Sequence, residues 1–103
     1  MIEEIFTAAA IPAQEGRFPN PPEQTYAVYF DAVTADGPDE VNRIFTHDYT
    51  VELYASAIDP DAKARLNREL DARGIKYTTQ GWYWLDSIRK YQEIYEFTHI
   101  EKI

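Results

Sequence analysis

The chain has 103 residues, of which 45% are hydrophobic and 27% are charged, and its formal net charge is −8. This length supports one domain with a modest core, and this composition is typical of a globular protein. The chain contains no cysteine, which excludes disulfides, thiolate metal ligands and a cysteine nucleophile. The acidic balance opposes binding to nucleic-acid phosphates and anionic lipid. We therefore expect a single domain, residues 1–103, with no specific nucleic-acid partner.

The N-terminal segment is acidic and amphipathic. Its apolar residues recur at helical spacing and predict a helix over residues 2–10, which Pro12 ends. The following segment, 11–24, is rich in proline and predicts an extended surface loop. The N-terminus lacks the basic region and apolar run of a signal peptide, and no apolar stretch approaches the ~20 residues that span a bilayer. We expect no membrane partner.

Two strands are predicted next, over residues 25–33 and about 42–55, with turn chemistry at 35–40 between them. In the first strand Tyr26, Val28 and Phe30 share one face. In the second strand one face is expected to meet the core, and the other to be partly wet. The residues expected at the core are Phe45, His47, Tyr49, Val51 and Leu53.

The second helix carries the clearest local signals. Asp59 is a natural N-cap with Pro60 at the first helical position, and Gly74 stands where a left-handed C-terminal residue is needed. Two further strands are predicted at residues 75–84 and 90–100. The expected fold is α+β, in the order α-β-β-α-β-β, with two short helices on one face of a four-stranded, mainly antiparallel sheet. The strand order and the connection at 85–88 stay open.

No group of residues predicts catalysis or a bound metal or cofactor. His47 and His99 lie in different strands, where a half-buried histidine with a hydrogen-bond partner is the common case. The acidic turn lacks the ligand alternation of a calcium loop, and the remaining candidates have capping or turn roles. That turn contains Asp36, Asp39 and Glu40, and the other candidates are Asp59, Asp61, Ser56 and Ser87. We therefore expect a protein that is not an enzyme and has no cofactor.

The aromatic run Trp82-Tyr83-Trp84 is the candidate interaction site. In a strand Trp82 and Trp84 point to one face and Tyr83 to the other, so both faces carry a large aromatic side chain. One interpretation is that one face is core and the other packs across strands. The other is that one face meets a neighbouring subunit, because Trp and Tyr are enriched at interface hot spots.

A series of short segments resembles the small tail-completion, or tail-terminator, proteins of the head-tail joining region of long-tailed bacteriophages and prophages. The resemblance covers nearly the whole chain, and its specificity lies in the order and spacing of the segments. The run Gly81-Trp82-Tyr83-Trp84 is more aromatic than that family's pattern. The segments are the Ile-rich N-terminal helix, Ile11-Pro12, Phe18-Pro19, Tyr-Ala-Val-Tyr-Phe at 26–30, Tyr-Thr-Val-Glu-Leu-Tyr at 49–54, Gly-Ile-Lys-Tyr at 74–77 and Lys-Tyr-Gln-Glu-Ile-Tyr-Glu at 90–96.

The resemblance implies a structural component of the virion tail, which is in the bacterial host cytoplasm during assembly. Such a protein forms a ring, usually a hexamer, on the head-proximal end of the tail tube, and contacts the tube protein and the head connector or stopper. Passive passage of DNA through an acidic ring agrees with the net charge. Two alternatives stay open: another neck component, such as a stopper or adaptor, and a small acidic binding module that inhibits a host protein. An enzyme with a pocket at His47 or His99 is a third interpretation.

Overall fold

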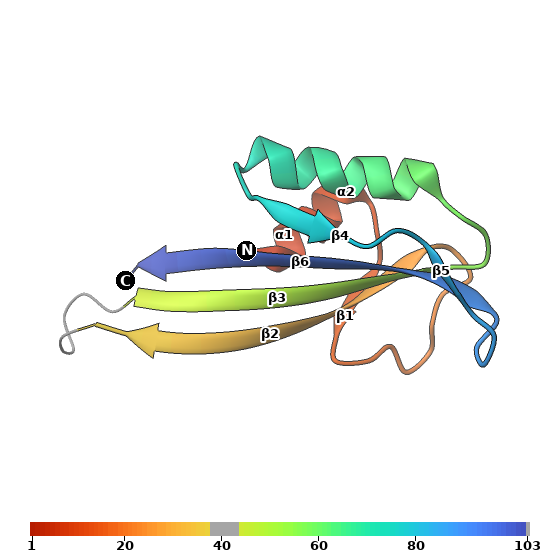
Figure 1. Cartoon of the computed structure of the whole chain (residues 1–103), viewed down its shortest axis with the longest axis horizontal. Helices are drawn as coiled ribbons and strands as arrows, with labels where there is room; N and C mark the ends of the chain where they lie inside the picture. Colours follow the sequence, from red (N-terminus) through yellow and green to blue (C-terminus); the bar gives the residue numbers. More distant parts are fainter. Residues whose placement is uncertain (38–43, 103) are drawn as a thin grey trace.

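The computed structural model describes residues 1–37 and 44–102. The fold is of the predicted α+β class, with each of two helices followed by three strands where two strands were expected (Figure 1). In chain order they are α1 (Ile2–Ala9), β1 (Ala13–Glu15), β2 (Tyr26–Asp36), β3 (Ile44–Ala55), α2 (Pro60–Ala72), β4 (Tyr77–Thr79), β5 (Tyr83–Leu85) and β6 (Lys90–Lys102).

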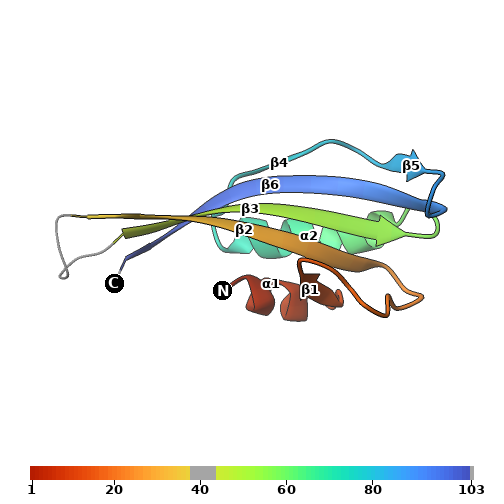
Figure 2. The same ribbon diagram turned by 90° about the horizontal axis from the view of Figure 1, so that it is seen from below.

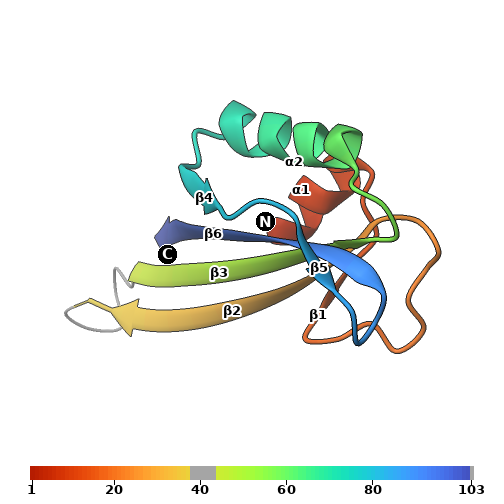
Figure 3. The same cartoon turned by 45° about the vertical axis from the view of Figure 1, so that its right-hand side comes forward.

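The strands form one mixed, six-stranded sheet. Its three long strands lie in the order β2-β3-β6, and both of their contacts are antiparallel. β4 and β5 pair with the other edge of β6, one after the other, and β1 pairs in parallel with the start of β2. β5 lies at the start of β6, and the C-terminal end of β6 is at the opposite end of the sheet (Figure 3). Since β2 and β6 are both antiparallel to β3, they run in the same direction.

Both helices pack on one face of the sheet, as predicted, and form the hydrophobic core there (Figure 1). Ile5 of α1 and Leu66 of α2 are fully buried, and both belong to one cluster with Val51 of β3 and Tyr95 of β6. Of the five residues expected at the core from residues 42–55, Tyr49, Val51 and Leu53 are buried. The other two, Phe45 and His47, are only half-buried.

The ends of α2 follow the predicted local chemistry. The Asp59 carboxylate accepts a hydrogen bond from the backbone N–H of Ala62 at 3.1 Å, which satisfies a donor that the helix leaves unpaired. At the other end Gly74 has φ +68°, and the N–H of Ile75 donates to the carbonyl of Leu70. This is the Schellman arrangement, and Ile75 packs back on the core.

The predicted four-stranded sheet was wrong in two places. The segment 11–24 is not only loop, because Ala13–Glu15 pairs with residues 27–29 of β2. The single strand predicted at 75–84 is divided into β4 and β5 by an interruption at Gln80–Trp82, where Gly81 has φ +90°. The open connection at 85–88 is a tight turn that ends at Arg89, which has φ +55°. Of the predicted turn at 35–40, residues 38–40 lie outside the described part, and with them Asp39 and Glu40.

The three long strands extend well beyond the helices (Figures 1 and 2). A helix of 13 residues such as α2 is about 20 Å long, whereas a strand of 13 residues such as β6 is about 43 Å long. The helices therefore cover only part of the sheet, and the molecule is elongated, 48 × 27 × 22 Å. We call the uncovered part the ribbon: residues 31–36 of β2, 44–48 of β3 and 98–102 of β6.

Candidate assembly surface

The ribbon exposes apolar side chains on a sheet that no helix covers. Val33 is 51% exposed and Ile100 is 56% exposed, and Phe30, at the base of the ribbon, is 44% exposed. These three residues come from the two outer strands, β2 and β6, so apolar surface lies along both sides of the ribbon. Because side chains alternate along a strand, Val33 lies on the same face as the buried Tyr29, and Phe30 and Ile100 lie on the opposite face.

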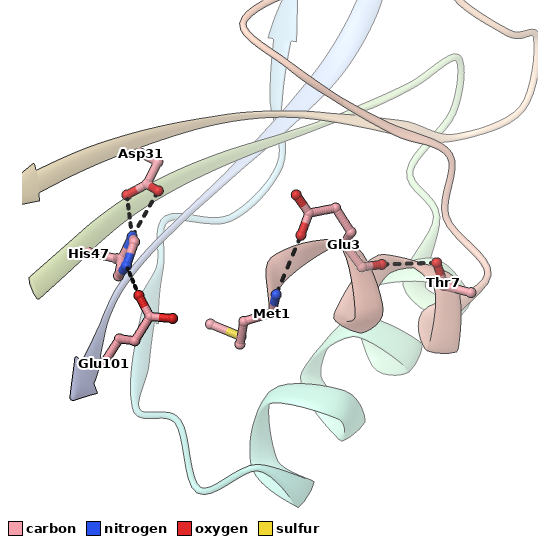
Figure 4. Close-up of polar contacts among 6 residues, drawn as sticks. All are labelled: Met1, Glu3, Thr7, Asp31, His47 and Glu101. Atoms are coloured by element: carbon pink, nitrogen blue, oxygen red, sulfur yellow. Dashed lines mark hydrogen bonds and ion pairs between the residues drawn. The ribbon is translucent and has the colours of Figure 1, made fainter. Parts of the chain in front are cut away.

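His47 fixes the base of the ribbon on the helix side (Figure 4). Its Nδ1 lies 2.8 Å from Oδ2 of Asp31 in β2, and its Nε2 lies 3.3 Å from Oε1 of Glu101 in β6. The imidazole also stacks on Tyr49 with 5.6 Å between ring centroids. The hydrogen bond to Asp31 and the nearby carboxylate charges raise the pKa of His47 above its ordinary value, against the opposing effect of burial. The histidine thereby links all three strands, most strongly when it is protonated.

His99 lies directly across the strand pair from His47, with 6.2 Å between the ring centroids. A small hollow of about 230 Å³ lies beside the two rings, between the ribbon and the start of α1. Met1 and Glu3 line the hollow, and the N-terminal amine pairs there with the Glu3 carboxylate at 3.4 Å (Figure 4). Within residues 1–37 and 44–102 no group of histidine and carboxylate side chains has the arrangement that would hold a metal ion. The pair has the geometry of a structural cross-strand contact.

The three predicted site residues lie together but in different environments. Trp82 is half-buried and packs against the hydrophobic core. Tyr83 is 68% exposed and Trp84 is 40% exposed, and the Trp84 ring meets Tyr91 of β6 edge-on at 4.9 Å. Trp82 packs on the core and Trp84 packs across strands on Tyr91, as in the first interpretation of this run. Tyr83 and Trp84 are the members with exposed surface for a partner.

A buried carboxylate positions this aromatic segment. Glu93 of β6 is fully buried, and its Oε1 lies 2.6 Å from the Lys63 ammonium of α2. Its Oε2 accepts hydrogen bonds from the backbone N–H groups of Gln80 and Gly81, at 3.1 and 2.6 Å. These two donors belong to the interruption between β4 and β5, so Glu93 takes the place of a strand partner there. Sequence reasoning missed this residue, although a glutamate on the core face between Tyr91 and Tyr95 was a visible signal.

A shallow depression of about 720 Å³ lies where β4 begins, next to the start of the ribbon in β6. Its lining comes from the loop between α2 and β4, including Ile75 and Lys76, and from residues of β6, including Thr98 and Ile100. The ribbon was missed from the sequence as a surface, although the predicted lengths of strand 42–55 and helix 59–73 contained the signal. A strand of that length cannot be covered by a helix of that length.

The chain was compared with known proteins. No protein-family model matches it, and neither does any curated protein sequence. Among solved structures it is similar to a chain of a particle described as the virion of native gene transfer agent (GTA) particle. The TM-score is 0.55, the identity is 15%, and the match covers 96% of this chain and 84% of that chain. The two chains share a fold. Among the described residues, none of the helices has the length and apolar character needed to cross a membrane.

Proposed function

We propose that this protein is a structural component of a phage-type particle, and that it completes the tail at its head-proximal end. The observation that carries the proposal is the shared fold, which extends over 96% of the chain and pairs it with a chain of a virion particle. The order of segments that resembles tail-completion proteins supports the same role. In this role the protein forms a ring on the tail tube and offers its other side to the head connector or stopper.

The surface chemistry supports a role in assembly rather than in catalysis. Exposed large side chains occur on or beside the ribbon and at Tyr83 and Trp84, which are at opposite ends of the long strands; Ile58 and Ile88 are also exposed and lie outside these two features. Two separate contact surfaces are what a subunit needs if it binds both its own copies and a different protein. We propose the ribbon for contacts between copies, and Tyr83 and Trp84 for the tube or connector protein.

The net charge of −8 supports a ring that DNA crosses without being held. Like charges repel the phosphate backbone, so a lumen lined by this protein does not retain a passing genome. A basic lumen in an assembled ring would count against this part of the proposal.

Electron microscopy of particles made without this protein tests the role. The coding sequence is deleted from the genome that produces the particle, and a second copy supplied in trans serves as the control. Overlong tails that are not joined to filled heads are the expected result, because an uncapped tube continues to grow. Tails of normal length beside leaking heads would place the protein on the head side of the neck. Intact particles would contradict an assembly role and would favour a binding module with a host target.

A further inference from the structure

The two outer edges of the ribbon carry unpaired backbone groups. The N–H of Ala27 donates to the carbonyl of Pro12, and the carbonyl of Tyr29 accepts from Gly16, so odd-numbered residues of β2 direct their N–H and C=O groups away from β3. The pairing with β1 ends at Tyr29. From Asp31 to Asp36 no described strand lies along this edge. The backbone groups of residues 31, 33 and 35 therefore point outward, and no strand among residues 1–37 and 44–102 pairs with them.

The opposite edge has the same character. The alternation along β2 and β3 assigns odd-numbered residues of β6 to β3 and even-numbered residues to the outer edge. β4 pairs with this edge only as far as Phe97. Thr98, Ile100 and Lys102 therefore direct their N–H and C=O groups outward. The two open edges lie at the same level of the sheet, because Ala32 and Asp36 are in register, through β3, with Thr98 and Lys102.

The β2 edge of the ribbon lacks the devices that usually prevent strands from joining, and the β6 edge carries one of them, Lys102, at its far end. Proteins protect a sheet edge with proline, with a bulge or with lysine side chains. β2 has none of these over residues 31–36, and its register with β3 is regular throughout. Residues 32–35 are uncharged, in a chain whose net charge of −8 makes copies repel elsewhere. At the far end the charges are complementary, since Asp36 stands on one edge and Lys102 on the other.

We propose that the β2 edge of the ribbon in one copy pairs in parallel with the β6 edge of the ribbon in a second copy, and so continues the sheet between subunits. Strands β2 and β6 run in the same direction, so copies related by rotation about an axis along the strands present parallel edges to one another. The contact joins two different edges, and such a head-to-tail contact closes into a ring when the rotation between neighbouring copies divides a full turn. This inference rests on the proposed ring and identifies the atoms that form its subunit contact.

Proline substitutions at outward-facing positions test the pairing. Val33→Pro and Ile100→Pro each remove one outward N–H group and leave the hydrogen bonds to β3 in place, so both variants are expected to fold. Val33→Thr and Ile100→Thr keep the N–H group and are the matched controls. Oligomeric state is measured by sedimentation over a wide range of protein concentration, and far-ultraviolet circular dichroism reports the fold.

The expected result is assembly by wild type and by both threonine variants, and folded monomers for both proline variants. A mixture of the two proline variants should give dimers only, because Val33→Pro retains its β6 edge and Ile100→Pro retains its β2 edge. A wild-type protein that stays monomeric overturns the proposal. Normal assembly by either proline variant also overturns it. If Val33→Pro blocks assembly and Ile100→Pro does not, the contact is a pairing of two β2 edges instead.

Hydrogen exchange followed by NMR gives a second reading that needs no substitution. Assembly should slow exchange at the amides of residues 31, 33 and 35 on β2, and of 98, 100 and 102 on β6. The neighbouring amides of residues 32 and 34 already donate to β3 and should change little. Unchanged exchange at both edges in assembled protein refutes the strand contact. The tail-completion role would be unaffected, because the deletion experiment tests that role separately.

Discussion

Removal of the Glu93 carboxylate is expected to destabilise the domain and to loosen the aromatic segment that follows β4. Breaking a buried ion pair from one side costs about 3–5 kcal/mol. The Lys63 side chain is 26% exposed, so its ammonium group can be hydrated when Glu93 is removed. The loss of the ion pair in Glu93→Ala should therefore cost an amount near the lower end of that range. The substitution also leaves the backbone N–H groups of Gln80 and Gly81 without their acceptor. The free energy of unfolding is therefore expected to fall by about 4 kcal/mol in total. That loss is a large part of the 5–15 kcal/mol by which a domain of this kind is stable.

Glu93→Gln is the milder change and keeps the variant measurable if Glu93→Ala does not fold. The amide oxygen can still accept from the N–H groups of Gln80 and Gly81, whereas the charged bond to Lys63 is lost, at a cost of about 2 kcal/mol. For a domain of this size the melting temperature should fall by about 8–16 °C. Glu96→Gln is the matched control, because Glu96 lies on the same strand and is exposed, and a change within about 0.5 kcal/mol is expected.

The assay uses the chain's two tryptophans, Trp82 and Trp84, which both belong to the segment that Glu93 holds. Urea unfolding is followed by tryptophan fluorescence and, in parallel, by far-ultraviolet circular dichroism. In Glu93→Gln the fluorescence should change at lower urea than the dichroism, because the segment detaches before the sheet unfolds. If Glu93→Gln matches Glu96→Gln in both signals, the buried carboxylate does not hold the segment and the reasoning is refuted.

Three further predictions concern the histidine, the helix cap and the aromatic surface. Because the pKa of His47 is raised on folding, its stabilising contribution is complete below the unfolded value of about 6.5 and is lost as pH rises through the folded value. His47→Gln should remove that part of the decline in free energy of unfolding above pH ~6.5, and an unchanged pH profile would refute the link. Gly74→Ala should lower the free energy of unfolding, measured by thermal melting, by about 1 kcal/mol. The cause is the φ of +68°, which disfavours a residue with a side chain, because an added Cβ would meet no atom. An unchanged stability would show that the helix end adapts. Tyr83→Ala with Trp84→Ala should leave stability within about 1 kcal/mol of wild type and still impair tail joining in a complementation assay, since both side chains are exposed; normal joining would remove this surface from the proposed function.

The parts of the fold that were predicted correctly depend on neighbouring residues in the sequence. The α2 helix has its N-cap at Asp59 and its left-handed residue at Gly74, and these signals act within one helical turn. The apolar alternation of Val51 and Leu53 assigned the core face of β3 for the same reason, because side chains alternate strictly along a strand.

The parts that were missed depend on residues far apart in the sequence. The strand expected at 75–84 is interrupted because Gln80 and Gly81 donate to Glu93, and Lys63 from a different element compensates that charge. β1 forms because its three residues pair with the start of β2, to which the proline-rich loop connects them. A strand of three residues is too short to show an alternating pattern in the sequence. The candidate site follows the same rule. The run at 82–84 was visible in the sequence, whereas the division between half-buried Trp82 and exposed Tyr83 is set by the packing.

The position of β6 has a consequence for how the chain folds during its synthesis. β6 lies inside the sheet, between β3 and the short strands β4 and β5, yet it follows all of them in the chain. Until it leaves the ribosome, Tyr95 and Phe97 are missing from the core, and one whole side of β3 stays open. Pairings between distant parts of a chain form slowly. The edge of β3 that pairs with β6 is therefore expected to stay exposed until β6 has been synthesised. Newly made chains are thus most prone to wrong strand pairing at the open edge of β3 before β6 is available.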